Sequence, residues 1–340
     1  MNKVAVLGGG SFGTVIANMS ATQGVSTTLW MRSEKQLQDI LDTGINSRYV
    51  PKYPLHTSLM LTNDLAAAVS SADLVFIAVP SKAFRIVLSQ ALAFMPPHTA
   101  LVSLTKGIEP DGFLLMSEVM IALAPSRSVG VISGPNLAKE IAQGQLAGTV
   151  IASRSEPLRN AVHDLLSNPR FRVYTNPDVY GVELAGALKN IYAIASGMAA
   201  ALSLGENARA LLLTRSLAEM SRFAVRLGAN PLTFIGLAGM GDLMVTCTSV
   251  LSRNYRVGEA LGQGYTLRQA VKQLGETAEG INTLRMVKLK ADTMSVSMPI
   301  VEALYAIIHE NEEVEHLANR LMLGERASDV EFIFDLESLP

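Results

Sequence analysis

The first residues that could do chemistry are three glycines near the amino terminus. Gly8, Gly10 and Gly13 stand in G-x-G-x-x-G spacing, directly after an apolar run and before the helical pattern "TVIANMSATQG". In such a turn the first glycine permits a tight bend, the second lets the backbone approach a pyrophosphate, and the third brings helix and strand together. The helix amino terminus then faces the negative charge. Because the motif opens a strand–helix series, we expect a dinucleotide to bind here.

The end of the second predicted strand carries a cation where sites selective for NAD usually carry a carboxylate. An Asp or Glu about 20 residues after the glycines ordinarily bonds the ribose 2′-hydroxyl. Here the strand ends at Arg32 and Ser33, which suit a 2′-phosphate, with Lys35 as a helper. The sequence therefore favours NADP(H). Glu34 keeps NAD(H) open, and Arg32 could also be an ordinary solvated loop residue.

A single lysine lies in an otherwise uncharged helical segment. Between Leu184 and Gly205 the only formally charged residue is Lys189. On a helix it shares its face with Ala185, Gly186, Tyr192 and Ala193. This is not a solvated charged face, although an isolated lysine can also extend its ammonium to the surface.

Four other segments carry polar side chains that could meet a substrate. Lys106 ends a strand in "SLTKGIE", Asn136 begins a helix in "SGPNLAKEI", Asp242 follows a glycine loop in "GLAGMGDL", and Ser252, Arg253 and Asn254 stand together in "LSRNYRVG". Each has an ordinary structural explanation when taken singly: a surface lysine, a helix cap or a solvated arginine.

The first half of the chain alternates short β-rich runs with helical patterns, which is typical of βαβ units on a parallel sheet. The runs are 4–8, 27–31, 74–79, 100–104 and 128–133, and 148–153 can extend the same sheet. Ligands of such sheets bind beyond the carboxyl ends of the strands.

Long helical patterns replace these runs from about Val179 onward. We therefore predict an α/β protein with an N-terminal Rossmann-type doubly wound sheet followed by an all-α domain. Residues 1–178 form the dinucleotide-binding domain and 179–340 the helical substrate and catalytic domain, whose acidic end receives no function.

Composition excludes several classes of function. Lys+Arg number 28 against 30 Asp+Glu, with no basic block, so nucleic acid is not an expected partner. The one cysteine, Cys247, rules out an intramolecular disulfide and indicates a reducing cytoplasm; we interpret it as a packed residue rather than a nucleophile. The five histidines form no H-x-x-x-H pair, so no metal site is predicted.

Membrane insertion and secretion are not expected either. The amino terminus lacks the pattern of a signal peptide. The uncharged run 190–205 is shorter than the roughly 20 residues of a membrane span, so we interpret it as a buried helix. Hydrophobic residues make up 49% of the chain, which fits a large interior or a homodimer interface.

Taken together, these segments resemble the bacterial, soluble type of NAD(P)-dependent glycerol-3-phosphate dehydrogenase. The matching motifs run in order from "GGGSFGT" through "SLTKGIE", "SGPNLAKEI", "ELAGALKNIYAIASGM", "GLAGMGDLMVTCTS", "SRNYRVG" and "AEGINT" to "MPIVEALYAI". They cover nearly the whole chain up to about residue 310. Several long motifs at coherent spacing are far more specific than one glycine fingerprint.

The resemblance implies the reversible reduction of dihydroxyacetone phosphate to sn-glycerol 3-phosphate, a precursor of glycerophospholipids. It implies that Lys189 is the proton donor and acceptor, and that Arg253 with its neighbours holds the phosphate. The implied substrate residues are Lys106, Gly134, Asn136, Lys189, Asp242, Ser252, Arg253 and Asn254. The implied cofactor residues beyond the three glycines are Ser11, Phe12, Arg32, Tyr49, Lys106, Ala138, Arg253 and Glu279. The Phe12 position is commonly tryptophan or tyrosine in that family.

Two other functions stay open at this point. A 3-hydroxyacid or 6-phosphogluconate type of dehydrogenase shares the two-domain architecture and a lysine on the first helix of the second domain, although "SRN" and "SGPN" argue against it. A nonenzymatic redox sensor could bind NAD(P)H and report to a partner, but no DNA-binding module is visible in the sequence.

Overall fold

The chain divides into two compact units, Met1–Glu183 and Leu184–Pro340. The structure, a computed structural model, describes residues 2–110, 112–274 and 279–314. The division falls inside helix α8 (Val179–Ala201). The acidic stretch at the end of the predicted second domain, 323–340, lies outside the described residues, as does the segment 315–322 before it.

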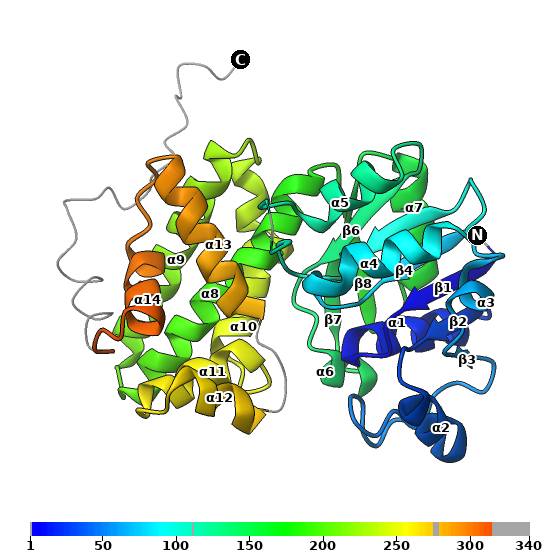
Figure 1. Cartoon of the computed structure of the whole chain (residues 1–340), viewed down its shortest axis with the longest axis horizontal. Helices are drawn as coiled ribbons and strands as arrows, with labels where there is room; N and C mark the ends of the chain where they lie inside the picture. Colours follow the sequence, from blue (N-terminus) through cyan, green and yellow to red (C-terminus); the bar gives the residue numbers. More distant parts are fainter. Residues whose placement is uncertain (1, 111, 275–278, 315–340) are drawn as a thin grey trace. The chain divides into compact units, whose positions relative to one another are not determined.

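The first unit is built on one eight-stranded sheet, in the order β3-β2-β1-β4-β5-β6-β7-β8 (Figure 1). Its strands are β1 (Lys3–Leu7), β2 (Ser26–Trp30), β3 (Met60–Thr62), β4 (Leu74–Ile77), β5 (Ala100–Ser103), β6 (Val129–Ser133), β7 (Ala147–Ser153) and β8 (Phe171–Asn176). The six runs predicted from the sequence are all strands. We did not predict β3, which is too short to show a period, or β8, whose buried Phe171 and Val173 alternate with exposed residues.

The sixth predicted run extends the same sheet, as expected, but it does so as an antiparallel strand. β7 pairs antiparallel with β6, with Ser133 opposite Val150, whereas the other neighbouring strands pair parallel. The connection from β6 to β7 contains only the five-residue helix α6 (Ala138–Ala142). Such a helix spans about 7 Å, less than the length of β6, so it does not form the long helical crossover that is usual in a parallel βαβ unit.

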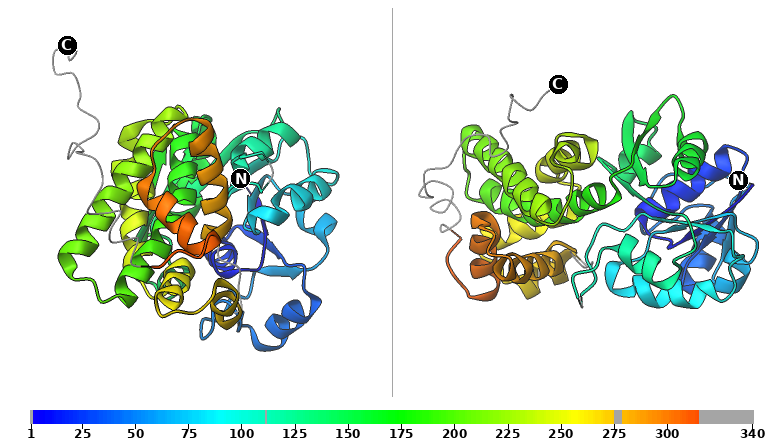
Figure 2. Two further views of the ribbon diagram at one scale, coloured as in Figure 1. Left: turned by 60° about the vertical axis from the view of Figure 1, so that its left-hand side comes forward. Right: turned by 90° about the horizontal axis from the view of Figure 1, so that it is seen from above.

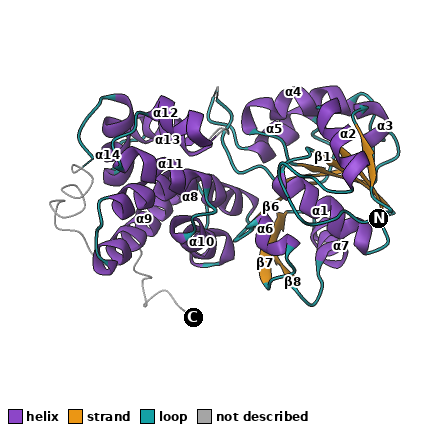
Figure 3. Ribbon diagram, turned by 90° about the horizontal axis from the view of Figure 1, so that it is seen from below, coloured by secondary structure: helices purple, strands orange, loops and turns teal. Residues whose placement is uncertain are grey.

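Helices cover both faces of the sheet, as a doubly wound fold requires. On one face α1 (Ser11–Thr22) packs against α6 and α7 (Glu156–Leu166). On the other, α4 (Ser81–Leu92) packs against α3 (Leu65–Val69) and α5 (Met116–Leu123), while α2 (Glu34–Thr43) lies beside β3 (Figure 3). The central strands are therefore apolar and covered on both faces; β4, for example, is buried along its whole length.

The second unit consists of helices, and its described part contains no strand (Figure 2). After α8 come α9 (Glu206–Arg226), a 3-10 turn (Pro231–Ile235), a π-helical turn (Leu237–Gly241), α10 (Asp242–Thr248), α11 (Arg253–Gly262), α12 (Leu267–Leu274), α13 (Glu279–Thr293) and α14 (Pro299–His309). The glycine segment before Asp242, predicted as a loop, is thus a helical turn.

Helix α8 is the centre of this unit. Every residue from 181 to 199 is buried, so this helix is covered on all sides rather than on one face. The predicted buried helix, 190–205, is confirmed as far as Ala199; α8 ends at Ala201, and residues 200–205 are half-buried or exposed. Within the described residues, no helix combines the length and the hydropathy needed to cross a bilayer.

A buried carboxyl group ties α8 and α9 to α14. Glu219 accepts hydrogen bonds from the backbone N–H groups of Ile300 and Val301, both at 3.0 Å, and from the hydroxyl of Tyr192 at 3.3 Å. Burial raises the pKa of Glu219 from an ordinary 4.5 to about 7, although the hydrogen bonds from Ile300 and Val301 oppose the shift.

This shift predicts how Glu219 contributes to stability as pH changes. Because its pKa is higher in the folded chain than in the unfolded one, its contribution is fully present below about pH 4.5 and is lost as pH rises through about 7. In Glu219→Gln, we expect the fall in unfolding free energy between pH 5 and 8 to be smaller by about 1–3 kcal/mol. Urea denaturation across this range measures it.

Exposed Glu206, on the same helix, provides the matched control Glu206→Gln, which should keep the wild-type pH slope. Burial also raises the pKa of Glu183 to about 7. Because Glu183 is unchanged in both variants, its contribution to the pH dependence of the unfolding free energy is the same in both. An unchanged slope in Glu219→Gln would contradict the assignment.

Candidate active site

The glycine turn after β1 leaves open space at the amino terminus of α1. Gly8 has φ +127°, and a Cβ there would lie 2.4 Å from the carbonyl oxygen of Ala78; a Cβ at Gly13 would lie 2.1 Å from that of Gly8. A Cβ at Gly10 would meet no atom within 4 Å. Gly10 is the N-cap of α1, and no side chain caps the helix. This cradle fits a pyrophosphate, because free backbone N–H groups face open space.

Two side chains that we did not predict hold this turn in place. The amide nitrogen of buried Asn46 donates to the carbonyl oxygen of Gly9 at 3.0 Å and to the hydroxyl of Thr14 at 2.8 Å. The amide nitrogen of Gln36 donates to the same Gly9 oxygen at 2.6 Å. Both residues lie more than 25 positions from Gly9, so no local sequence pattern could have indicated them.

The other predicted cofactor residues of the first unit lie beside this turn or after β2. Arg32 is exposed two residues after β2, and Ser33 caps α2 by accepting from the N–H of Gln36 at 3.2 Å. Ser11 donates to the backbone oxygen of Tyr49 at 3.3 Å, which joins two predicted residues. Phe12 and Tyr49 are partly buried against the core.

Lys106 lies at the carboxyl end of β5, where it contacts the segment that follows β6. Its ammonium donates to the carbonyl oxygen of Gly134 at 2.7 Å, so two predicted substrate residues are neighbours. The loop after Lys106 is held by a two-bond ion pair in which the Arg85 guanidinium donates to both carboxylate oxygens of Glu109, at 2.6 and 2.8 Å. Arg85 was not predicted.

The segment after β6 contains three predicted residues. Gly134 has φ +139°, Asn136 is partly buried, and Ala138 is the first residue of α6. Asn136 therefore lies two residues before the helix rather than at its N-cap, which is Leu137.

Lys189 and Asp242 form a buried ion pair in the second unit. Lys189 is 6% exposed and Asp242 is fully buried, and the ammonium donates to a carboxylate oxygen of Asp242. It also donates to the hydroxyl of Thr246 at 2.7 Å. Buried charges are tolerated when each is paired and hydrogen-bonded. Thr246 was not singled out, although its place one helical turn after Asp242 was an available signal.

The start of α11 brings the predicted Ser252, Arg253 and Asn254 together. Ser252 is the N-cap and accepts from the N–H of Tyr255, which leaves its hydroxyl proton to donate. Arg253 is exposed in the first turn. Asn254 donates to the side-chain oxygen of Asn190, the neighbour of Lys189, at 2.9 Å.

The same Asn254 side chain reaches the start of α13. Its oxygen accepts from the N–H of Gly280 at 3.1 Å, next to the predicted cofactor residue Glu279, the first residue of α13. Asn254 thus connects the surroundings of Lys189 and of Glu279. Its contact with a ligand stays a prediction.

Glycines bring the backbones of α8 and α11 into direct contact. A Cβ at Gly197 would lie 2.0 Å from the carbonyl oxygen of Tyr255, and a Cβ at Gly258 would lie 1.9 Å from that of Ile194. Since no side chain separates them, the spacing of these helices is fixed by main-chain atoms. These two helices carry Lys189 and Arg253.

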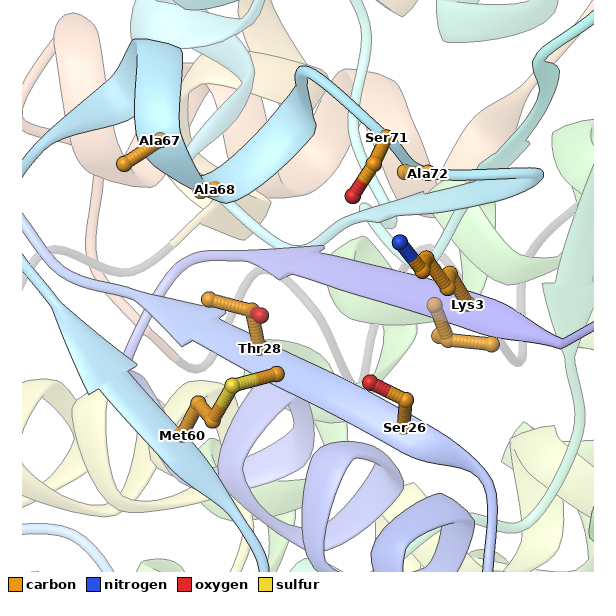
Figure 4. Close-up of a pocket in the computed structure, with 9 residues that line it drawn as sticks. Lys3, Ser26, Thr28, Met60, Ala67, Ala68, Ser71 and Ala72 are labelled. Carbon is orange, nitrogen blue, oxygen red and sulfur yellow. The ribbon is translucent and has the colours of Figure 1, made fainter.

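Other reactive groups have ordinary roles. Burial raises the pKa of the Cys247 thiol to about 12, which fits a packed residue rather than a nucleophile. The described residues hold no group of three or more metal-ligating side chains. A pocket lies at the first residues of β1, β2 and β3, namely Lys3, Ser26 and Met60 (Figure 4). That is the amino end of the strands, where ligands of this fold do not bind.

Comparison with known proteins decides the family. The chain matches the model of the NAD-dependent glycerol-3-phosphate dehydrogenase N-terminus over residues 3–158 and that of its C-terminus over residues 178–319. The chain belongs to the NAD-dependent glycerol-3-phosphate dehydrogenase family. The family expected from the sequence motifs is therefore confirmed, as is the expectation of a nicotinamide-dependent oxidoreductase.

Relatives of this family match almost the full length. The glycerol-3-phosphate dehydrogenase (NAD(P)+) of Alcanivorax borkumensis is 53% identical over 331 residues, 97% of this chain and 96% of the relative. The enzyme of the same name from Saccharophagus degradans is 52% identical over 96% of this chain and 92% of its own. The crystal structure of the Coxiella burnetii glycerol-3-phosphate dehydrogenase has a TM-score of 0.91 and 36% identity, covering 94% of this chain and 98% of that one.

The glycine contact predicts the effect of one added methyl group. In Gly258→Ala the new Cβ cannot fit against Ile194, so we expect α8 and α11 to separate. The free energy of unfolding should fall by about 2 kcal/mol or more, and the dehydrogenase activity expected of the family should fall with it. Guanidinium denaturation and steady-state kinetics measure the two effects.

Gly205→Ala is the matched control, since a Cβ there meets no atom within 4 Å. As the N-cap of α9 it should cost less than about 1 kcal/mol. Equal stability of the two variants would show that the helix contact is looser than its geometry indicates.

Proposed function

We propose that this chain reduces dihydroxyacetone phosphate reversibly to sn-glycerol 3-phosphate, with Lys189 as proton donor and acceptor. The observation that carries the proposal is the buried Lys189, held by Asp242 and Thr246 in a helix with no other charge from Leu184 to Ala201. Burying an ammonium is costly, and the two polar partners Asp242 and Thr246 stabilise it there. A group of this kind serves as a general acid at a carbonyl oxygen.

The chemistry requires a proton at the oxygen where negative charge develops. When bound, a reduced nicotinamide supplies the hydride to C2 of the ketone. Lys189 donates its proton to the C2 oxygen, and the Asp242 carboxylate stabilises the ammonium beforehand by electrostatic attraction. In the oxidation direction the neutral amine accepts the hydroxyl proton. The hydroxyl of Thr246, bonded to Nζ at 2.7 Å, keeps the amine oriented in both directions.

The start of α11 supplies the groups for the phosphate. Arg253 offers a planar fork of donors for two phosphate oxygens, and Ser252 has a hydroxyl proton free to donate. A phosphate held in this way fixes the ketone, so its binding energy acts on the reaction rate as well as on affinity. Lys106, Gly134, Asn136 and Asn254 complete the proposed substrate site.

The proposed cofactor site uses the cradle at Gly8, Gly10 and Gly13 for the pyrophosphate, with Ser11, Phe12, Arg32, Tyr49, Lys106, Ala138, Arg253 and Glu279 around the rest of the dinucleotide. In this division of labour, residues 1–178 bind the dinucleotide and residues 179–340 carry out the substrate chemistry. The open space above Gly10 supports the assignment.

The decisive experiment is NADPH oxidation with dihydroxyacetone phosphate by the wild type and by Lys189→Met. We expect kcat to fall by about 10²–10⁴-fold in the variant, because the general acid is lost, while NADPH still binds. Dihydroxyacetone, which lacks the phosphate, should be a very poor substrate of the wild type. Full activity in Lys189→Met would remove this residue from the mechanism.

Two further variants control this experiment. Lys288→Met removes a lysine that is paired with Asp292 within one exposed helical turn, and it should keep wild-type activity. Lys189→Met with Asp242→Asn removes the orphaned carboxylate, so a folded but inactive double variant separates catalysis from stability. Cofactor binding without turnover in the wild type would instead indicate a redox sensor.

We further propose a preference for NADP(H) over NAD(H). The support is exposed Arg32, two residues after β2, in the position where a carboxylate would select NAD(H). In Arg32→Ala, kcat/KM for NADPH should fall by about 10–100-fold, as expected for a lost bond to a charged group, while that for NADH changes little. Lys139→Ala, an exposed lysine on α6, is the control. A wild-type preference for NADH would refute the proposal.

We also infer a homodimer in a reducing cytoplasm. Large apolar side chains are exposed along one segment of the helical unit, at Leu232, Ile235, Met240, Met244 and Val250, which is typical of a contact surface. Sedimentation velocity measures the oligomeric state, and a monomer at micromolar concentration would exclude the dimer.

The lone Cys247 supports the proposal of a reducing cytoplasm as the compartment. Fractionation of cells expressing the tagged chain tests this proposal.

A further inference from the structure

The turn after β6 gathers hydrogen-bonding groups that the protein itself does not satisfy. Three buried side-chain atoms lack a hydrogen-bond partner among the described residues, and two of them lie here: Ser133 Oγ at the end of β6 and Asn136 Oδ1 in the turn that follows. A buried acceptor without a donor is destabilising. Such groups at a proposed binding site point to a ligand that supplies the missing donor.

The hydroxyl of Thr149 determines which way the Asn136 amide points. Thr149, on β7, is fully buried, and its hydroxyl donates to the carbonyl oxygen of Ser133 at 3.1 Å. A hydroxyl has a single proton, so toward Asn136 it can act only as an acceptor. The amide nitrogen of Asn136 accordingly donates to Thr149 Oγ1 at 2.9 Å. The amide oxygen is the group left over.

The turn that carries the Asn136 side-chain oxygen, and the chemistry of an amide, limit the ligand groups that this oxygen can bind. The turn at Gly134 adopts φ +139°, and a Cβ there would lie 3.2 Å from Cα of Thr149, so the backbone passes close to β7. The ammonium of Lys106 donates a hydrogen bond to the carbonyl oxygen of Gly134. An amide oxygen can only accept hydrogen bonds, so the group that it lacks is a donor such as a hydroxyl group.

We propose that Thr149 is a positioning residue that presents the Asn136 side-chain oxygen as an acceptor, and that this acceptor selects a ketone carrying a free hydroxyl group. The inference rests on the proposed function, in which Asn136 contacts the substrate. In dihydroxyacetone phosphate the donor is the hydroxyl on the carbon that bears no phosphate. Thr149 touches no substrate; it acts through Asn136.

The test compares two substrates that differ only in that hydroxyl. The rate of NADPH oxidation is measured with dihydroxyacetone phosphate and with hydroxyacetone phosphate, in which hydrogen replaces the free hydroxyl. The wild type should prefer the first by about 10–100-fold in kcat/KM, because the analogue leaves the Asn136 oxygen unpaired. In Thr149→Val, which keeps the side-chain volume but lets the amide turn over, the preference should shrink to a few-fold.

Thr149→Ser retains the hydroxyl and should restore the preference, which a merely structural role would not require. If Thr149→Val fails to fold, Asn136→Ala removes the acceptor directly and should also abolish the preference. A wild type that uses both ketones equally, or a Thr149→Val that keeps the wild-type preference, overturns the proposal.

A rise in KM for NADPH in Thr149→Val, with the hydroxyl preference intact, would assign the donor to the cofactor's carboxamide and also overturn it. These results are distinct from failure of the proposed function. In that case the wild type would not turn over dihydroxyacetone phosphate at all.

Discussion

A buried charge must be paired with an opposite charge beside it, and this requirement determines how helices pack in the helical unit. Lys189 lies on a helix that is covered on all sides, and only 6% of its surface is exposed. Asp242 supplies the opposite charge from the first residue of α10, and Thr246 supplies a further acceptor one turn later. Removing either member of such a pair costs about 3–5 kcal/mol, which ties the position of α10 to that of α8.

In both units, glycines let backbone segments pack closely, and this close packing brings polar groups together. In the sheet unit, Gly13 lets α1 approach the carbonyl oxygen of Gly8, which opens the amino terminus of the helix. In the helical unit, Gly258 lies against the backbone of α8, and a Cβ at Gly280 would lie 2.6 Å from the carbonyl oxygen of Asn190. Main-chain contacts are stiffer than side-chain contacts, since they lack rotamers. The groups carried on these backbones are therefore held at fixed spacing.

Much of this architecture could be predicted from the sequence because it depends on local patterns. Apolar runs gave six of the eight strands, and the isolation of Lys189 gave the buried helix. The family followed from long motifs in order. Thr149, Asn46 and the reversal of β7 were missed, because each depends on contacts between distant segments. Asn254 appeared in the sequence as a ligand residue, and only the fold shows its bonds to Asn190 and Gly280.

The reversal of β7 has a consequence for which residues can influence a binding site. Parallel strands bring only their last residues to the edge where ligands of this fold bind, so that the beginning of each strand is remote from chemistry. In an antiparallel neighbouring strand, the first residues lie at this edge instead of the last. Because Ser133 pairs with Val150, Thr149, the third residue of β7, lies at the carboxyl end of β6. One reversed strand thus places an interior, sheet-forming residue, Thr149, at the ligand-binding end of the sheet, within hydrogen-bonding distance of Asn136.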